Sequence, residues 1–206
     1  HQFDVNGFDE IQNELIDYAY GLKNKEPKGV SISNQGGWQS ADFSVNDEND
    51  LLHSFIINCL AGFPAVDESI NIKVDAWINI NSPGSLNVKH DHPDSNLAGV
   101  LWVQAPKDCG NIVFENPPGF QSYTDINSYV TDFNYKFNFH HTYIFPTIGG
   151  RILIFPAHLR HSVEENKSNE DRISVSFNIR LSSGRMKRRG RVSIPRWNFD
   201  WSNNKS

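Results

Sequence analysis

The sequence predicts an all-β core with flanking helices, arranged as an antiparallel sandwich or barrel. Two observations carry this prediction. The spacing of the apolar residues changes from about 3.6 to about 2 near residue 70, and strand patterns then follow one another without a helical interruption. No linker-like stretch divides the 206 residues, so we expect one domain over residues 1–181, with its core at 70–181, and a separate extension at 182–206.

Two helices are expected ahead of the strands. Residues 8–23 carry apolar side chains at helical spacing, with acidic residues at the front and lysines at the back, as suits the helix dipole. A second helix is expected over roughly residues 46–62, where asparagine or aspartate caps the start and glycine and proline end it. Between the helices, residues 30–33 predict a short strand and residues 36–37 a glycine turn.

The strand region begins with a long strand over residues 70–80, because Ile, Val and Ala alternate there with polar or aromatic residues. Further strands are expected at residues 86–90, 97–104, 111–115, 141–145, 151–155 and 172–181. The one long connection, residues 116–140, is rich in Asn, Tyr and Phe. Long loops in compact domains tend to be functional, so this loop is a candidate lid over a site.

Composition excludes several classes of protein. A net charge of -5 argues against generic binding to nucleic acid or to acidic membranes. The two cysteines, Cys59 and Cys109, give no disulfide framework, which predicts a reducing, cytoplasmic setting. We expect neither a membrane span nor a leader peptide, because no run of about 18 apolar residues occurs. Frequent Asn and Ile fit an AT-rich genome and are compatible with a phage origin.

Two histidine clusters are candidates for a metal site. In the first, His90, His92 and Asp94 alternate along an extended segment, so their side chains can point to one side and converge on a cation. The other interpretation of this segment is a polar turn before a strand. The second cluster follows the buried strand 151–155: His161 should face the interior because a strand resumes after it, whereas His158 lies in a turn and is expected at the surface.

The last strand has two different faces. One face is apolar, and the other carries Arg172, Ser174, Ser176 and Asn178. Such a strand commonly gives its polar face to water. In a barrel that is open at one end, however, the polar face can line the interior while the apolar face packs under the helices. Arg172 and Ser174 would then bind one carboxylate of an acidic small molecule.

Four segments in this order resemble the non-haem iron, 2-oxoglutarate-dependent oxygenases, and especially a small, mostly uncharacterised bacterial and phage branch of them. The segments are residues 90–93 (HDHP), 98–102 (AGVLW), 155–161 (FPAHLRH) and 172–178 (RISVSFN). The resemblance covers about residues 74–181. It implies a double-stranded β-helix (a jelly roll, as in cupins) with Fe(II) at its open end. It also implies 2-oxoglutarate and O2 as cosubstrates, and hydroxylation coupled to succinate formation.

The resemblance also implies roles for individual residues. His161 matches the distal histidine ligand, and Arg172, helped by Ser174, matches the residue that binds the distal carboxylate of 2-oxoglutarate. Trp102 stands where related enzymes place a hydrogen-bonding aromatic residue.

The first ligand pair departs from the usual pattern and leaves two assignments open. His92 and Asp94 match the usual His-x-Asp ligand pattern directly. His90 and His92 instead lie at the distance from the next strand that this ligand pair usually has. We expect His90, His92 and His161 at the iron, with Asp94 as the alternative ligand in place of His90 or as a partner that orients a histidine. His92 and His161 belong to both assignments and are the expected catalytic pair.

The expected function is therefore an Fe(II)- and 2-oxoglutarate-dependent dioxygenase that hydroxylates a peptide or protein side chain, or a small metabolite. The alternative is a cupin-type protein that binds a metal or a carboxylate without turnover. A third possibility is an interaction module in which the basic run at 185–191 contacts a phosphate-bearing or acidic partner. The other interpretation of this tail is a solvated extension whose tryptophans, at 197 and 201, pack on the body of the protein. A homodimer is one option for its assembly.

Overall fold

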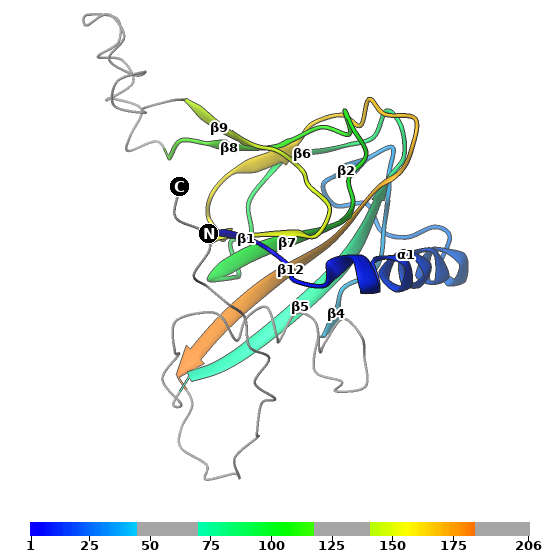
Figure 1. Ribbon diagram of the computed structural model, residues 1–206. Coiled ribbons are helices and arrows are strands. Elements are labelled where there is room, and N and C mark those ends of the chain that lie inside the picture. Colours follow the sequence, from blue (N-terminus) through cyan, green and yellow to red (C-terminus); the bar gives the residue numbers. More distant parts are fainter. Residues whose placement is uncertain (45–69, 118–140, 184–206) are drawn as a thin grey trace, which may run out of the picture.

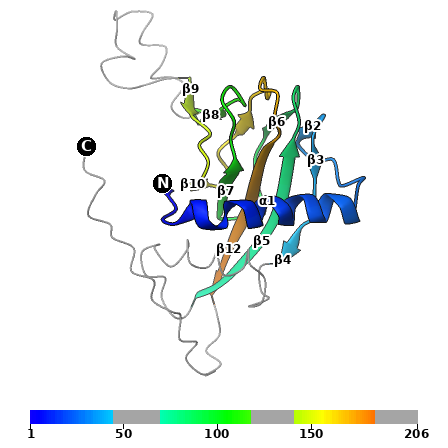
Figure 2. The ribbon, with the colours of Figure 1, turned by 45° about the vertical axis from the view of Figure 1, so that its right-hand side comes forward.

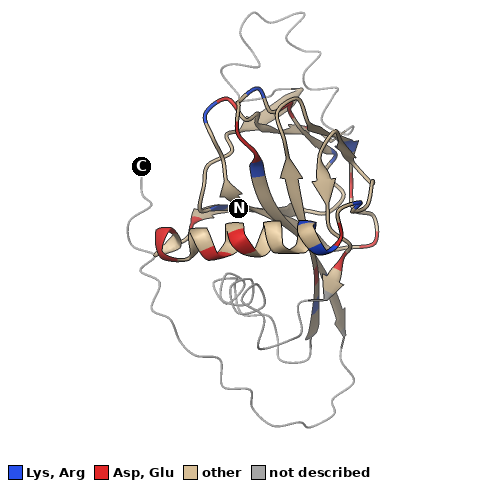
Figure 3. Ribbon diagram, turned by 90° about the vertical axis from the view of Figure 1, so that its right-hand side faces the viewer, with Lys and Arg blue, Asp and Glu red and all other residues tan. Residues whose placement is uncertain are grey.

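Two antiparallel sheets face each other, and the long helix α1 (Phe8–Lys25) crosses the outer face of the larger one (Figure 1). The computed structural model describes residues 1–44, 70–117 and 141–183. Helix α1 has acidic residues in its first turn and basic residues in its last turn, as the sequence predicted. Figure 3 shows the acidic residues spread along this helix.

The larger sheet has the order β1-β10-β7-β12-β5-β3, and β4 pairs with β5. Its strands are β1 (Gln2–Asp4), β10 (Arg151–Pro156), β7 (Leu97–Gln104), β12 (Arg172–Ser183), β5 (Ile70–Asn81), β3 (Trp38–Gln39) and β4 (Phe43–Ser44). The smaller sheet has the order β2-β6-β11-β8-β9. Its strands are β2 (Asn34–Gln35), β6 (Leu86–His90), β11 (His161–Val163), β8 (Ile112–Glu115) and β9 (Thr142–Phe145).

The strands from β5 to β12 form a jelly roll. Strands β5, β7, β10 and β12 lie in the larger sheet, whereas β6, β8, β9 and β11 lie in the smaller one. The chain therefore passes back and forth between the sheets, and this interleaved order is that of a double-sheet jelly roll. The predicted fold class is confirmed, with seven of its strands lying within a few residues of the positions expected from the sequence.

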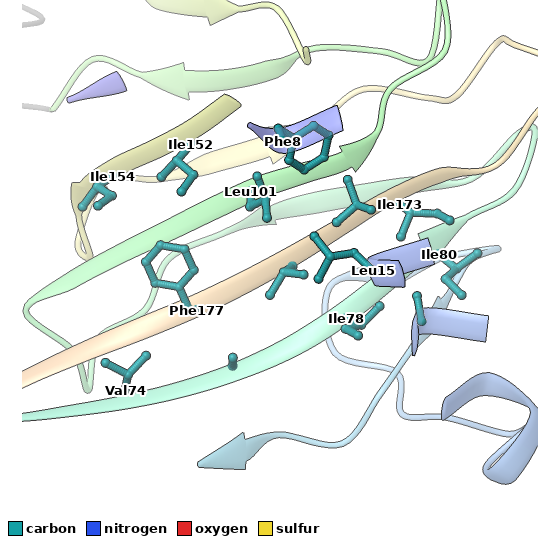
Figure 4. Packing of buried hydrophobic residues seen from close by; sticks show 14 of the residues in the cluster. Phe8, Leu15, Val74, Ile78, Ile80, Leu101, Ile152, Ile154, Ile173 and Phe177 are labelled. Carbon is teal, nitrogen blue, oxygen red and sulfur yellow. The ribbon is translucent and has the colours of Figure 1, made fainter. Parts of the chain in front are cut away.

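The outer face of the larger sheet carries the main hydrophobic core. Buried side chains of α1 pack against alternate residues of the central strands (Figure 4). The residues of β12 that take part in this packing are Ile173, Val175, Phe177 and Ile179. The intervening residues of the same strand must point between the two sheets. The polar face of β12 therefore lines the interior, which is the second of the two arrangements that the sequence allowed.

A second apolar cluster fills one side of the space between the sheets. It is built from β7, β8 and β10 and includes Trp102, Phe114 and Phe155. Strands β7 and β10 are buried on both faces because they contribute to both clusters. On the β5 and β12 side the interior is polar instead, and this is where the candidate site lies.

The prediction of a strand at residues 30–33 is wrong. The strand of this region is β2, at Asn34–Gln35. The side chain of Asn34 explains the difference, because its Oδ1 accepts a hydrogen bond from the backbone N–H of Ile32 and its Nδ2 donates to the carbonyls of Val30 and Gly37. This local bonding folds residues 30–33 into an irregular turn. Strands β1 and β4 are too short to give a periodic signal.

Three expectations fall outside the described residues: the second helix at about 46–62, most of the proposed lid at 116–140, and the basic tail. Strand β12 extends to Ser183, two residues beyond the domain limit expected at 181. Within the described part of the chain, no helix has both the length and the apolar character needed to cross a bilayer.

Packing in the larger sheet should make Gly99 sensitive to substitution. Gly99 of β7 pairs with Phe177 of β12, and a Cβ at this position would overlap the Phe177 ring. We expect Gly99→Ala to lower the free energy of unfolding by about 1–3 kcal/mol, measured by urea denaturation. Adding Phe177→Leu should recover part of this loss.

A matched control for this substitution lies in α1. A Cβ on Gly21 meets no atom within 4 Å, so Gly21→Ala should be neutral or should raise the free energy of unfolding by up to about 1 kcal/mol. Equal effects at the two glycines would contradict the packing argument.

Candidate metal and cosubstrate site

Strand pairing in the smaller sheet brings three histidines together. His90 ends β6, His161 begins β11, and the two residues are direct partners in the antiparallel register. His92 lies two residues after β6, where its backbone N–H donates to the carbonyl of Ala157 at 2.9 Å. Side chains that are far apart in the sequence therefore meet at one end of the sheet.

The three imidazoles can serve one cation. Their candidate ligand atoms all lie within 4.8 Å of one another. Nδ1 of His90 lies 2.7 Å from the carbonyl oxygen of Val88, and Nδ1 of His161 lies 2.9 Å from that of Leu159. Because a carbonyl can only accept, each Nδ1 carries the proton and each Nε2 keeps its lone pair for a metal.

Burial keeps these histidines neutral. Burial, together with the neighbouring imidazoles, lowers the pKa of His92 to about 4 and that of His161 to about 3. Burial also lowers the pKa of His90. A metal ligand must be the unprotonated imidazole, so the cluster is in its binding form at neutral pH.

Asp94 lies apart from this group. It is exposed, in a turn where the backbone N–H of Ser95 donates to the carbonyl of His92 at 3.2 Å. Among the described residues, the group of possible metal ligands consists of the three histidines without Asp94. His158 is exposed, as the sequence predicted.

Arg172 is a buried cation with spare hydrogen-bonding capacity. Its side chain is among the largest that are fully buried. Nη1 donates to the carbonyls of Cys109 and Glu164, whereas Nη2 is enclosed and has no hydrogen-bond partner. Burial lowers the pKa of Arg172 to about 10, so the guanidinium stays charged at neutral pH. A buried charge with an unpaired donor is costly unless an anion binds to it.

One cavity joins Arg172 to the histidines. Its walls include the three imidazoles together with Arg172, Ser174 and Trp102. Ser174 and Trp102 are both buried. The structure thus brings together every residue expected at the site, with the exception of Asp94.

Two residues that line the cavity were not predicted from the sequence. Asn79 of β5 donates to the hydroxyl of Ser176 at 3.1 Å, and the Trp77 ring lies 5.7 Å from the His92 ring. Both Asn79 and Trp77 line the cavity. They occupy the non-aliphatic face of the strand predicted at 70–80, so pairing that strand with the last one would have identified them.

The donor set suits a divalent cation and a dicarboxylate. Three neutral imidazoles can bind one face of a first-row metal and leave further positions open. A guanidinium in the same cavity can bind the free end of an acid that chelates the metal. The residues therefore fit Fe(II) together with 2-oxoglutarate.

Comparison with known proteins agrees with this chemistry. The family described as "Putative 2OG-Fe(II) oxygenase" matches residues 75–178. A prolyl-4-hydroxylase from Pseudomonas putida is similar in structure, with a TM-score of 0.61 and 12% identity over 87% of this chain and 91% of that one. No curated protein matches the sequence.

Two further solved structures show how widely the fold is used. The non-haem, α-ketoglutarate-dependent carbocyclase SnoK from nogalamycin biosynthesis has a TM-score of 0.56 and 11% identity, over 85% of this chain and 78% of that one. A prolyl hydroxylase from Trichoplax adhaerens, in complex with a peptide fragment of hypoxia inducible factor, has a TM-score of 0.56 and 12% identity, over 86% and 80%. At these identities the likeness shows the jelly-roll fold, whereas the family match spans half of the chain. The chain therefore belongs to the 2OG-Fe(II) oxygenase family, and its cofactors are Fe(II) and 2-oxoglutarate.

Proposed function

We propose that this oxygenase is a hydroxylase that acts on a peptide or protein side chain, or on a small metabolite. The observation that carries the proposal is the pairing, in one cavity, of three neutral imidazoles with a buried cation whose Nη2 has no partner. A purely structural metal would have no use for a carboxylate-binding cation beside it, which disfavours a cupin-type metal protein.

In this proposal His90, His92 and His161 hold the iron, and Asp94 is not a ligand. Arg172 and Ser174 bind the distal carboxylate of 2-oxoglutarate, and the indole N–H of Trp102 is available as a further donor. Bound Fe(II) and 2-oxoglutarate would support a reaction in which O2 is the oxidant: one oxygen atom enters succinate as 2-oxoglutarate loses CO2, and the other hydroxylates a C–H bond. Phe155, Ile112 and Val163 are apolar lining residues that limit access of water to the site.

Reconstitution without oxygen tests the cofactor roles. Adding Fe(II) and 2-oxoglutarate to the metal-free protein should give a visible metal-to-ligand charge-transfer band, and admitting air should then yield succinate. A protein that binds neither would contradict the proposal. Binding of both without any succinate after air is admitted, even in the presence of candidate substrates, would favour the alternative of binding without turnover.

Substitution of Arg172 should weaken the binding of 2-oxoglutarate. Arg172→Gln removes the positive charge, so we expect the Kd of 2-oxoglutarate to rise by about 30-fold or more. Arg172→Lys keeps the charge but loses the planar guanidinium that can donate two parallel hydrogen bonds, so we expect a smaller rise in this Kd. Ser174→Ala should raise it by about three- to tenfold. Titration calorimetry with the metal-loaded protein measures these changes. Unfolding curves check that each variant folds, and an unchanged Kd in both Arg172 variants would remove Arg172 from the site.

Metal affinity should distinguish the two ligand assignments. His90→Ala removes one imidazole from the cluster, so we expect Fe(II) affinity to fall by at least about 100-fold. Asp94→Asn alters an exposed side chain outside the cluster and should change affinity by less than about threefold. The reverse order of these two effects would assign the third ligand to Asp94.

Acidification should destabilise the metal-free protein through the same histidines. In the unfolded chain an imidazole has a pKa of about 6.5, whereas His92 and His161 have folded values of about 4 and about 3. The unfolded state therefore binds protons first, and the free energy of unfolding falls as the pH drops from about 6.5 toward 4. Urea denaturation at about pH 7 and about pH 5 measures the fall. The fall in the free energy of unfolding between these two pH values should be smaller in the double variant His92→Gln, His161→Gln.

A further inference from the structure

Strands β5 and β12 extend past the rest of the larger sheet. β12 pairs with β5 from Arg172 to Ser183, whereas its pairing with β7 ends at Ile179. Beyond that point, within the part of the chain that the structure describes, residues 70–73 and 180–183 pair as strands with each other alone, and Figure 2 shows this end of β5 and β12 below the body of the jelly roll. We call residues 70–75 and 178–183 the ribbon.

The ribbon continues the face of the sheet that lines the cavity. Six cross-strand pairs share this face, of which the innermost is Arg172 with Asn81 and the outermost is Ser182 with Asn71. The four pairs between them are, from the inside outward, Ser174 with Asn79, Ser176 with Trp77, Asn178 with Asp75, and Arg180 with Lys73. The first two of these four pairs line the cavity, as Arg172 does, and Trp77 lies beside His92. Successive pairs are two residues apart, or about 7 Å along the strand. From Trp77, the Asp75 position is therefore about 7 Å away and the Lys73 position about 13 Å away.

The outer two of these four pairs carry an excess of positive charge. The Asp75 carboxylate is buried between Lys73, whose Nζ lies 3.3 Å from Oδ1, and Arg180, which contacts Oδ2. Two cations therefore pair with one carboxylate, which leaves one positive charge in excess. The side chains of Lys73 and Arg180 are 55% and 43% exposed, so an outside ligand can reach them.

Hydrogen bonding at these pairs is also incomplete. Oδ1 of Asn178 and Nε of Arg180 are enclosed and have no partner. Unsatisfied polar atoms beside an active site commonly mark a place where a ligand or bound water completes the bonding. Next to the histidines this face carries no charge, because the pairs Ser174–Asn79 and Ser176–Trp77 are uncharged, and the cation that lines the cavity on this face, Arg172, lies at its inner end.

We propose that the ribbon binds an extended, acidic segment of the primary substrate, with Lys73 and Arg180 as the residues that select it. The inference rests on the proposed function and names the substrate class for the same site. A metabolite that is shorter than about 13 Å and whose C–H bond is held beside His92 does not reach the Lys73 position. An extended peptide gains about 3.3 Å per residue, so an acidic side chain about two to four residues from the reacting one would meet both cations.

Two labelled peptides test this inference on the anaerobic complex with Fe(II) and 2-oxoglutarate. Both peptides are fluorescein-labelled and have a proline at the centre. One has glutamate and the other has glutamine at the second and fourth positions on each side of the proline, and all remaining positions are glycine. Fluorescence anisotropy should show the glutamate peptide binding about fivefold tighter or more, with the difference shrinking as salt is added. Lys73→Gln should remove much of this preference while leaving the Asp75–Arg180 pair in place.

The double variant Lys73→Gln, Arg180→Gln should abolish the preference. Lys107→Gln is the matched control, because Lys107 is an exposed lysine in the turn after β7, outside the ribbon, and its removal makes the same change in charge. Equal binding of the two peptides, or an equal loss in the Lys73 and Lys107 variants, overturns the inference. The Kd of 2-oxoglutarate separates this failure from that of the proposed function. Wild-type protein and the ribbon variants should bind 2-oxoglutarate equally well whatever the outcome with the peptides, whereas wild-type protein that binds no 2-oxoglutarate overturns the proposed function itself.

Discussion

The antiparallel pairing of β12 with β5 and β7 is the constraint on which the rest of the structure depends. Because side chains alternate along a strand, this pairing places Ile173, Val175 and Phe177 under α1 and turns Arg172, Ser174 and Ser176 toward the smaller sheet. One set of backbone hydrogen bonds thereby fixes both the hydrophobic core and the polar lining of the cavity. A one-residue slip in register would exchange the two faces and place a guanidinium in the apolar layer, so stability and the site favour the same register.

The charge balance of the cavity explains its chemistry. Three imidazoles are neutral because they are buried, and Arg172 stays charged although it is buried. Without ligands the cavity is therefore short of negative charge, which a dianion such as 2-oxoglutarate would supply. An arginine anchored by two backbone carbonyls is also held in place before the acid arrives, so little side-chain entropy remains to be lost on binding.

Supporting contacts extend from the cavity to α1. The hydroxyl of Tyr20 donates to the Asp171 carboxylate at 2.8 Å, and Gln104 donates to the Asp171 carbonyl at 2.7 Å. These bonds fix the residue just before Arg172 at the start of β12. The same strand ends in the charged ribbon, so its twelve residues run from the anchored end, past the three histidines, to the surface. A deep, rigid end suits cosubstrate binding, and an exposed end suits selection of a larger partner.

The sequence by itself determined the main strands from residue 70 onward, the first helix and the two faces of the last strand. It also identified the three histidines, Arg172, Ser174 and Trp102 as residues of one site. These features are local, since period and turn chemistry follow from neighbouring residues. Tertiary structure decided the rest. The turn after His92 carries Asp94 to the surface, the pairing of β6 with β11 puts His90 opposite His161, and the pairing of β5 with β12 adds Asn79 and Trp77 to the walls. The register between distant strands is set by packing and hydrogen bonding over the whole sheet, and no single segment contains that information.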